Sequence, residues 1–355
     1  MASLQMQSQQ LICTKPFEWL EISSDQGRSA YLCCEGWLNI PAGQTRNADG
    51  SSRRDIESDV WYGDVAKSIR KSVLDGSFRF CNQTLCPHLS KVDGPVKYVT
   101  NLEWQQYLKL YKANAGFPPK TLNLAYDRSC NLACPSCRSD IIMANGDERE
   151  SNQQYAEGLI KQFNGKMGEL YLTGSGDPFA SRHYFDFLTG PFLKNYKDIK
   201  LRIHTNAQLL TPNRWKKIAH LGPRISLLEV SIDGACKKTY EINRHPGKWE
   251  PLMENMAFIT QLRKDGEIPF LKVTFVVQKN NWREMGDFVE MGRKWNADLI
   301  FFMPLNNWGT YRHQEYEARA VHRPTNIEHD QFVDYLRTGE IQGEDVDFGA
   351  FADLI

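Results

Sequence analysis

The most constraining feature of the sequence is an alternation between short apolar segments and amphipathic segments that starts at Lys120. Six apolar runs have the length and composition of buried strands, and they lie at 120–126, 168–173, 199–205, 226–232, 270–277 and 298–304. Helical patterns separate them, and one of these starts at Thr211-Pro212, an N-cap residue followed by proline at the first helical position. Successive β/α units predict parallel strands covered by helices, an α/β fold of the partial (β/α)6 TIM-like barrel type. Ligands in such folds bind at the carboxyl ends of the strands.

The chain before Lys120 lacks this rhythm and is rich in turns. We expect a hairpin between 17–22 and 30–40, and a helix with Asp64 as its N-cap and Val65 on its apolar face. The chain is thus expected to have three parts: a small irregular α+β domain at 1–118, the partial barrel at 119–315 and a C-terminal helical extension at 316–355.

Charge and hydrophobicity exclude several classes of protein. The 43 basic and 43 acidic residues give a formal net charge of zero, which argues against a broad phosphate-binding surface and against a polybasic membrane anchor. The N-terminal residues MASLQMQSQQL are polar and lack the apolar core of a signal peptide. The longest apolar run, from Leu299 to Met303, is too short to span a bilayer. We therefore expect a cytoplasmic protein with no nucleic-acid or membrane partner.

Nine cysteines in a chain without an export signal favour metal ligation over disulfides. Three of them, Cys130, Cys134 and Cys137, follow the first predicted strand with the spacing Cys-x-x-x-Cys-x-x-Cys. Three thiolates on one short loop can bind three irons of a 4Fe–4S cluster and leave the fourth iron open, as a catalytic metal requires. A zinc site or a redox-sensitive loop is the alternative, although zinc would need a fourth ligand and none is close in sequence.

Further motifs follow the next predicted strands. The second strand ends in Gly174-Ser175-Gly176-Asp177-Pro178, where glycine would let the backbone approach a ligand. The third ends in His204-Thr205-Asn206. The fourth is followed by Ser231, Asp233 and Arg244, whose hydroxyl, carboxylate and guanidinium groups suit a polar ligand.

In this order, the motifs resemble those of the radical S-adenosylmethionine (SAM) superfamily over roughly residues 120 to 310. The resemblance implies a 4Fe–4S cluster on the three cysteines, SAM on the open iron, and reductive cleavage of SAM to a 5′-deoxyadenosyl radical. It also implies an electron donor of the flavodoxin or ferredoxin type. Gly174 to Pro178 are similar to the family's GGEP motif, which holds the SAM amino group. Asn206, Ser231, Asp233 and Arg244 lie where relatives contact the rest of SAM.

Five further cysteines precede the barrel, at positions 13, 33, 34, 81 and 86. Their sequence surroundings resemble the SPASM and twitch domains, which bind auxiliary iron–sulfur clusters and usually follow the barrel. This resemblance implies a second 4Fe–4S cluster on Cys13, Cys33, Cys81 and Cys86, with Cys34 as the alternative to Cys33. A structural zinc site and unligated buried thiols are the other possibilities, because zinc also accepts four cysteines.

The resemblance to SPASM-containing enzymes implies a peptide made on the ribosome as the substrate, to be crosslinked, epimerised or rearranged. A separate leader-peptide-binding partner would then be needed, because no winged-helix pattern is visible. Cys236 could return a hydrogen atom to a substrate radical, or be a small residue at a helix start. Gln278 and Trp308, just past strand ends, could line a substrate pocket or simply pack. The alternatives are a dehydrogenase or mutase acting on a small molecule, and a non-catalytic iron–sulfur protein.

Overall fold

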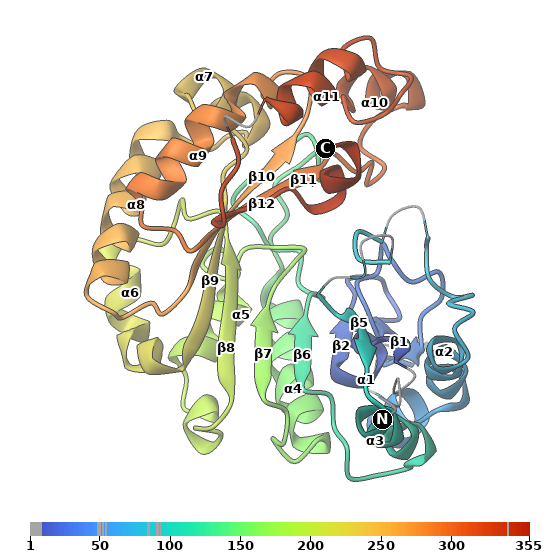
Figure 1. The fold of residues 1–355 in the computed structure, drawn as a ribbon. Helices are drawn as coiled ribbons and strands as arrows, with labels where there is room; N and C mark the ends of the chain where they lie inside the picture. Colours follow the sequence, from blue (N-terminus) through green and yellow to red (C-terminus); the bar gives the residue numbers. More distant parts are fainter. Residues whose placement is uncertain are drawn as a thin grey trace, which may run out of the picture. The chain divides into compact units, whose positions relative to one another are not determined.

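The computed structural model describes residues 9–47, 51, 53, 55–83, 86–89, 92, 94–338 and 341–355. The chain divides into two compact units (Figure 1). Unit 1 contains Met1–Tyr126 and Gln154–Tyr171, and unit 2 contains Asp127–Gln153 and Leu172–Ile355.

Unit 2 is built on parallel strands. Neighbouring strands pair in the order β8 (Lys200–Thr205), β9 (Ile225–Ser231), β10 (Leu271–Val277), β11 (Leu299–Pro304) and β12 (Val346–Asp347). Every pair in this series is parallel. Because parallel strands need crossover connections, a helix follows most of them.

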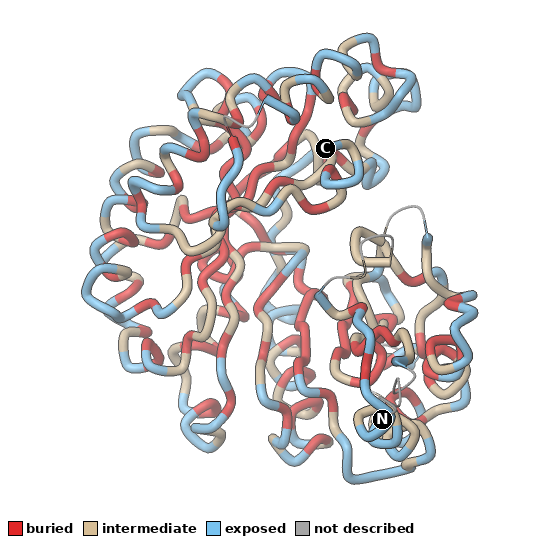
Figure 2. The backbone as a smooth tube through the Cα atoms, in the orientation of Figure 1, coloured by how far each residue is buried: buried red, intermediate tan, exposed pale blue. Residues whose placement is uncertain are grey.

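The helices of unit 2 cover these strands. They are α5 (Arg182–Thr189), α6 (Pro212–Ile218), α7 (Lys237–Asn243), α8 (Trp249–Lys264), α9 (Met285–Lys294), α10 (His313–Arg319) and α11 (His329–Arg337). Thr211 caps α6 by accepting from the backbone N–H of Arg214, as its sequence predicts. Buried residues are concentrated on the strands and on the inner sides of the helices (Figure 2).

Unit 1 holds the remaining strands. Neighbouring strands follow one another in the order β7 (Glu169–Leu172, whose last residue belongs to unit 2), β6 (Thr121–Leu124), β2 (Trp19–Ile22), β3 (Ser29–Tyr31) and β4 (Gly43–Gln44). A separate two-stranded sheet pairs β1 (Gln10–Cys13) with β5 (Val96–Val99). The helices are α1 (Lys15–Glu18), α2 (Asp64–Leu74), α3 (Asn101–Lys112) and α4 (Gly146–Gln162), the last divided between the two units.

The predicted α/β class with parallel strands is confirmed, and all six predicted barrel strands are present as β6 to β11. The predicted hairpin is also present, as β2 and β3, but it is shorter than expected because only Glu21 and Ile22 pair with Tyr31 and Ala30.

The start of α2 differs from its prediction. Gly63 is the N-cap and Asp64 is the first helical residue. A Cβ at Gly63 would lie 2.1 Å from the carbonyl oxygen of Asp59, so a residue with a side chain cannot take this place. Val65 is 40% exposed, whereas Ile69 and Val73 are fully buried and form the apolar face. In the described part of the chain, no helix combines the length and apolarity needed to cross a membrane.

Candidate functional site

The loop after β6 brings three cysteines together. Cys130 and Cys134 are buried, and they pack with Leu132 and the half-buried Cys137. Backbone hydrogen bonds hold the loop, from the N–H of Cys137 to the carbonyl of Cys134 (2.8 Å) and from the N–H of Cys130 to the carbonyl of Ile142 (2.8 Å). Asp127 anchors its start, since its carboxylate accepts from the N–H of Ser129 (2.8 Å) and the hydroxyl of Ser181 (2.6 Å). These hydrogen bonds fix the loop in a conformation that places the three thiols close together.

Arg138 belongs to the site although no sequence motif identifies it. It is buried, and its guanidinium donates to the carbonyls of Arg128 and Ser175 and lies 3.5 Å from the sulfur of Cys137. One side chain therefore ties the cysteine loop to the glycine-rich turn. Its position directly after the third cysteine was the only sequence signal, and arginine at such a place is usually exposed.

The glycine-rich turn after β7 lies against the cysteine loop. A Cβ on Gly176 would come within 2.4 Å of the carbonyl oxygen of Asp127 and 2.7 Å of that of Ser129, so only glycine fits. Gly174 has no such constraint, because a Cβ there would meet no atom within 4 Å. Pro178 completes the turn before α5.

Asp177 is fully buried and its carboxylate is saturated by the protein. One oxygen accepts from the hydroxyl of Thr205 (2.7 Å) and the N–H of Asn206 (2.8 Å). The other accepts from the N–H groups of Phe179 (2.9 Å) and Ala180 (3.1 Å). The Asp177 side chain therefore organises the turn and the end of β8.

Asn206, at the end of β8, reaches the cysteine loop. Its Nδ2 lies 3.6 Å from the sulfur of Cys130 and donates to Oδ1 of Asn131 at 3.0 Å. The structure thus places this predicted SAM-contact residue against the predicted cluster ligands.

Asp233 and Arg244 form a buried ion pair after β9. Nε of Arg244 lies 2.8 Å from Oδ2 of Asp233, and its NH1 is 4.0 Å from the sulfur of Cys134. Burial opposes the charged form of Arg244, but the charges of Asp233 and Cys134 outweigh it and raise its pKa. Asp233 has a φ of 63° and accepts from the N–H of Val276 at 2.7 Å. Both predicted residues therefore lie beside the cysteine loop.

Ser231 lies in a hydrogen-bonded row across three strands. Its hydroxyl is 2.6 Å from Nε2 of His204 and 2.9 Å from Oγ1 of Thr274. Burial lowers the pKa of His204, which favours the neutral imidazole. The pairing of His204 with Ser231 was missed because it depends on strand register.

Cys236 is exposed and forms the N-cap of α7. Its sulfur lies 3.4 Å from Oγ1 of Thr239 and 3.5 Å from Oε1 of Glu284. Of the expected pocket residues, Gln278 is buried, and its side-chain oxygen has no hydrogen-bond partner in the described part of the chain. Trp308 is 59% exposed.

The five cysteines that precede β6 lie in unit 1. Backbone bonds from Asn39 to Phe80 and from Asn82 to Trp37, each 2.9 Å, bring the segment after Cys34 alongside Cys81. Burial, reinforced by the nearby thiols of Cys81 and Cys86, raises the pKa of Cys13 to about 12.

Cys33 and Cys34 have different surroundings. Burial, with Cys13 and Cys34 as charged neighbours, raises the pKa of Cys33. Burial and the carboxylate of Glu21 raise the pKa of Cys34 to about 12. Of the two, only Cys33 has Cys13 among the charged neighbours that raise its pKa.

Donor chemistry at both groups suits iron–sulfur clusters, because each consists of free thiols that are buried or half-buried. Within the described ranges, no three Cys, His, Asp or Glu side chains already converge on one point where a single metal ion could sit. The thiols of each group therefore lie near one another, but their side chains would have to rotate to ligate one cluster.

Comparison with known proteins identifies the family of the central region. Residues 127–292 match the family model described as radical SAM superfamily. A GTP 3′,8-cyclase of Synechocystis sp. is 25% identical over 198 residues, covering 55% of this chain and 57% of the relative. An AdoMet-dependent heme synthase of Nitratidesulfovibrio vulgaris is 24% identical over 165 residues, covering 46% and 42%. The chain thus spans about half the length of these curated relatives.

Among solved structures, Streptococcus suis SuiB bound to precursor peptide SuiA is similar, with a TM-score of 0.46 and 15% identity. The match covers 82% of this chain and 65% of SuiB. The cysteine loop, the glycine-rich turn and the ends of β8 and β9 all fall within the matched family region. Residues 127–292 of this chain therefore form a radical SAM superfamily domain.

Proposed function

We propose that this chain is a radical SAM enzyme in which Cys130, Cys134 and Cys137 ligate a 4Fe–4S cluster whose fourth iron binds SAM. The observation that carries the proposal is the packing of these three thiols in one buried loop within the radical SAM domain. When bound, the cluster would supply the electron that cleaves SAM to methionine and a 5′-deoxyadenosyl radical, which abstracts hydrogen from the substrate.

Two arginines prepare the loop for thiolate ligands. The guanidinium of Arg138 lies 3.5 Å from the sulfur of Cys137, and that of Arg244 lies 4.0 Å from the sulfur of Cys134. Burial raises the pKa of Cys134, and the nearby Arg244 opposes this effect by stabilising the thiolate, which is the form that binds metal. Burial of the loop excludes water, which protects reactive intermediates.

The SAM site is proposed to comprise the turn Gly174, Ser175, Gly176, Asp177 and Pro178 together with Asn206, Ser231, Asp233 and Arg244. Support comes from their arrangement: Asn206 and Arg244 reach the sulfurs of Cys130 and Cys134, respectively. Asp177 would act indirectly, by holding the turn against the end of β8. Spectroscopy of the reduced cluster tests this set, since SAM should change its electron paramagnetic resonance (EPR) spectrum in the wild type and much less in Asn206→Ala.

A second 4Fe–4S cluster on Cys13, Cys33, Cys81 and Cys86 is proposed for unit 1. The mutual influence of these thiols on one another's pKa values supports this set. Iron and sulfide analysis of the reconstituted protein separates the alternatives. About eight irons per chain would support two clusters, and about four irons with one zinc would support a structural zinc site.

We propose a ribosomally made peptide as the substrate. This proposal rests on the resemblance of the N-terminal cysteines to SPASM and twitch domains, and a separate partner would present the leader sequence. Cys236 is proposed to donate a hydrogen atom to the substrate radical, since its exposed sulfur would be accessible. Modification of a co-expressed precursor peptide, detected as a mass change, tests the substrate class.

A small-molecule substrate is the second candidate. It is favoured by the names of the two curated relatives, a GTP cyclase and a heme synthase. Consumption of small-molecule candidates without any change in a co-expressed peptide would favour this reading. Absence of SAM cleavage by a fully loaded protein would leave a non-catalytic iron–sulfur protein.

A further inference from the structure

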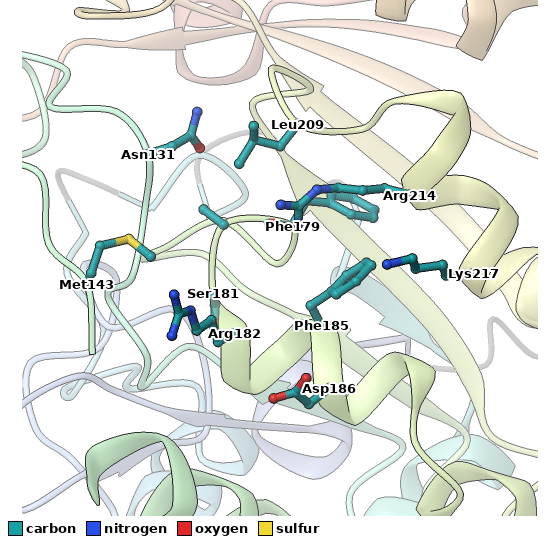
Figure 3. Close-up of a pocket in the computed structure, with 11 residues that line it drawn as sticks. Asn131, Met143, Phe179, Ser181, Arg182, Phe185, Asp186, Leu209, Arg214 and Lys217 are labelled. Atoms are coloured by element: carbon teal, nitrogen blue, oxygen red, sulfur yellow. Dashed lines mark hydrogen bonds between the residues drawn. The ribbon is translucent and has the colours of Figure 1, made fainter. Parts of the chain in front are cut away.

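A cavity of about 370 Å³ opens on unit 2 beside the cysteine loop (Figure 3). Residues from three segments line it: Asn131 and Met143 from the cysteine loop and its continuation, Phe185 and Arg182 from α5, and Arg214 and Lys217 from α6. None of the residues proposed to contact SAM lines this cavity.

The cavity carries an excess of positive charge. Arg182, Arg214 and Lys217 line it, and none of the three has an acidic partner among the residues that the structure describes. The one acidic lining residue, Asp186, is neutralised by Arg149, whose guanidinium lies 2.5 Å from its carboxylate. The whole chain has a formal net charge of zero, so the positive charge is concentrated locally at this cavity. Such a local excess favours the binding of an acidic ligand.

Apolar side chains complete the surface. Arg214 and Lys217 lie 5.0 and 5.9 Å from the ring centre of Phe185, which orients both cations over α5 (Figure 3). Met143 is 48% exposed, and Ile141, two residues earlier, is 51% exposed. Exposed apolar side chains flanked by charges are typical of protein-binding surfaces, whereas a small anion would leave them in water.

The cavity adjoins the proposed cluster ligands directly. Its wall includes Asn131, which follows Cys130 in the chain. Oδ1 of Asn131 accepts from Asn206, whose same nitrogen lies 3.6 Å from the sulfur of Cys130. The cavity wall thus contains the chain neighbour of a proposed cluster ligand, and a short separation would favour electron transfer.

We propose that this basic cavity, with the exposed side chain of Met143 in its wall, is the docking surface for an acidic one-electron carrier protein. This proposal rests on the proposed function, because it assigns the surface at which a carrier would reduce the SAM-cleaving cluster. One electron would pass from the reduced flavin or iron–sulfur centre of the carrier to the cluster on Cys130, Cys134 and Cys137. The carrier is thereby oxidised by one electron and the cluster reduced by one. Carboxylates of the carrier would pair with Arg182, Arg214 and Lys217.

Charge reversal at the two exposed cations tests the proposal. Arg182→Glu/Lys217→Glu is compared with Lys264→Glu/Lys294→Glu, which reverses two exposed charges at the ends of α8 and α9. The dissociation constant for an acidic bacterial flavodoxin is measured by calorimetry on the reconstituted protein, from about 50 to about 300 mM salt. We expect the first variant to bind roughly tenfold more weakly and with a smaller salt dependence, and the second to bind like the wild type.

Equal affinity of the first variant and the wild type would overturn the proposal, as would equal weakening in both variants. Phosphate titration addresses a small-anion site: phosphate binding lost in the first variant, with flavodoxin binding retained, would also overturn it. Dithionite separates this proposal from the proposed function, because it supplies electrons without docking. SAM cleavage with dithionite should be the same in all three proteins, and its absence in the wild type would count against the function instead.

Discussion

Nε of Arg244 lies 2.8 Å from Oδ2 of Asp233, and both side chains are largely buried beside the cysteine loop. The pair joins the start of the β9–α7 connection to the end of α7, and the same guanidinium reaches the sulfur of Cys134. A buried pair of this kind makes each partner depend on the other, because either charge alone would be costly in the interior.

Replacement of Asp233 should therefore destabilise the fold. Asp233→Asn keeps a residue that tolerates the positive φ but leaves Arg244 buried without its counter-charge, so the free energy of unfolding should fall by about 3 kcal/mol. Urea denaturation measures this loss. Asp233→Asn/Arg244→Met should lose less than the sum of the two single variants, and simple additivity would show that the pair is not coupled.

The glycine-rich turn gives a matched pair of variants. Gly176→Ala places a methyl group against the carbonyl oxygens of Asp127 and Ser129, so we expect a loss of about 1–3 kcal/mol in stability and less iron bound by the reconstituted protein. The methyl group of Gly174→Ala meets no atom within 4 Å, so this variant should keep the stability and the iron content of the wild type. Similar behaviour of the two variants, in denaturation and iron analysis, would show that the turn does not pack as described.

Cys33 and Cys34 should differ in iron content. Cys33 lies near Cys13, whereas Cys34 interacts with Glu21, so only Cys33→Ser should lower the iron count, by about four per chain. Cys34→Ser serves as the control for the loss of a neighbouring buried thiol. Loss of iron from Cys34→Ser alone would assign the ligand to the other cysteine.

The stability of the fold at acidic pH should depend on His322, which lies outside the proposed SAM site. Burial, assisted by Arg323 and His329, lowers its pKa from 6.5 to about 4. Between these values the unfolded chain binds a proton that the folded chain does not, so the free energy of unfolding falls as the pH drops through this window. Complete titration of the difference corresponds to on the order of 3 kcal/mol.

His322→Leu should remove this contribution while leaving the acid titration of the carboxylates in place. Chemical denaturation of both proteins at pH values from about 7 to about 4 measures the difference. Parallel pH profiles for the wild type and the variant would show that His322 titrates normally in the folded protein.

The strands of the fold were predictable because their signal is local. Each of β6 to β11 is an apolar run bounded by polar residues, and no long-range information is needed to find it. The cysteine loop was predictable for the same reason, since its three thiols lie within one short segment.

The contacts around the site were not predictable, since they join distant segments. Arg138 meets Ser175 only once the turn after β7 is in place, and His204 meets Ser231 only through the register of β8 on β9. The saturation of Asp177 likewise depends on the end of β8. A sequence pattern can identify residue types that suit a ligand. The folded structure determines which of their polar atoms already form hydrogen bonds within the protein.

Formation of 5′-deoxyadenosine from SAM tests the central claim most directly. The reconstituted protein is reduced with dithionite, supplied with SAM, and analysed by chromatography and mass spectrometry, with Cys134→Ala as the control. We predict 5′-deoxyadenosine and methionine in equal amounts from the wild type and none from the control. A wild-type protein that holds its iron and binds SAM, yet forms no 5′-deoxyadenosine, would contradict the assignment of Cys130, Cys134 and Cys137 to a SAM-cleaving cluster.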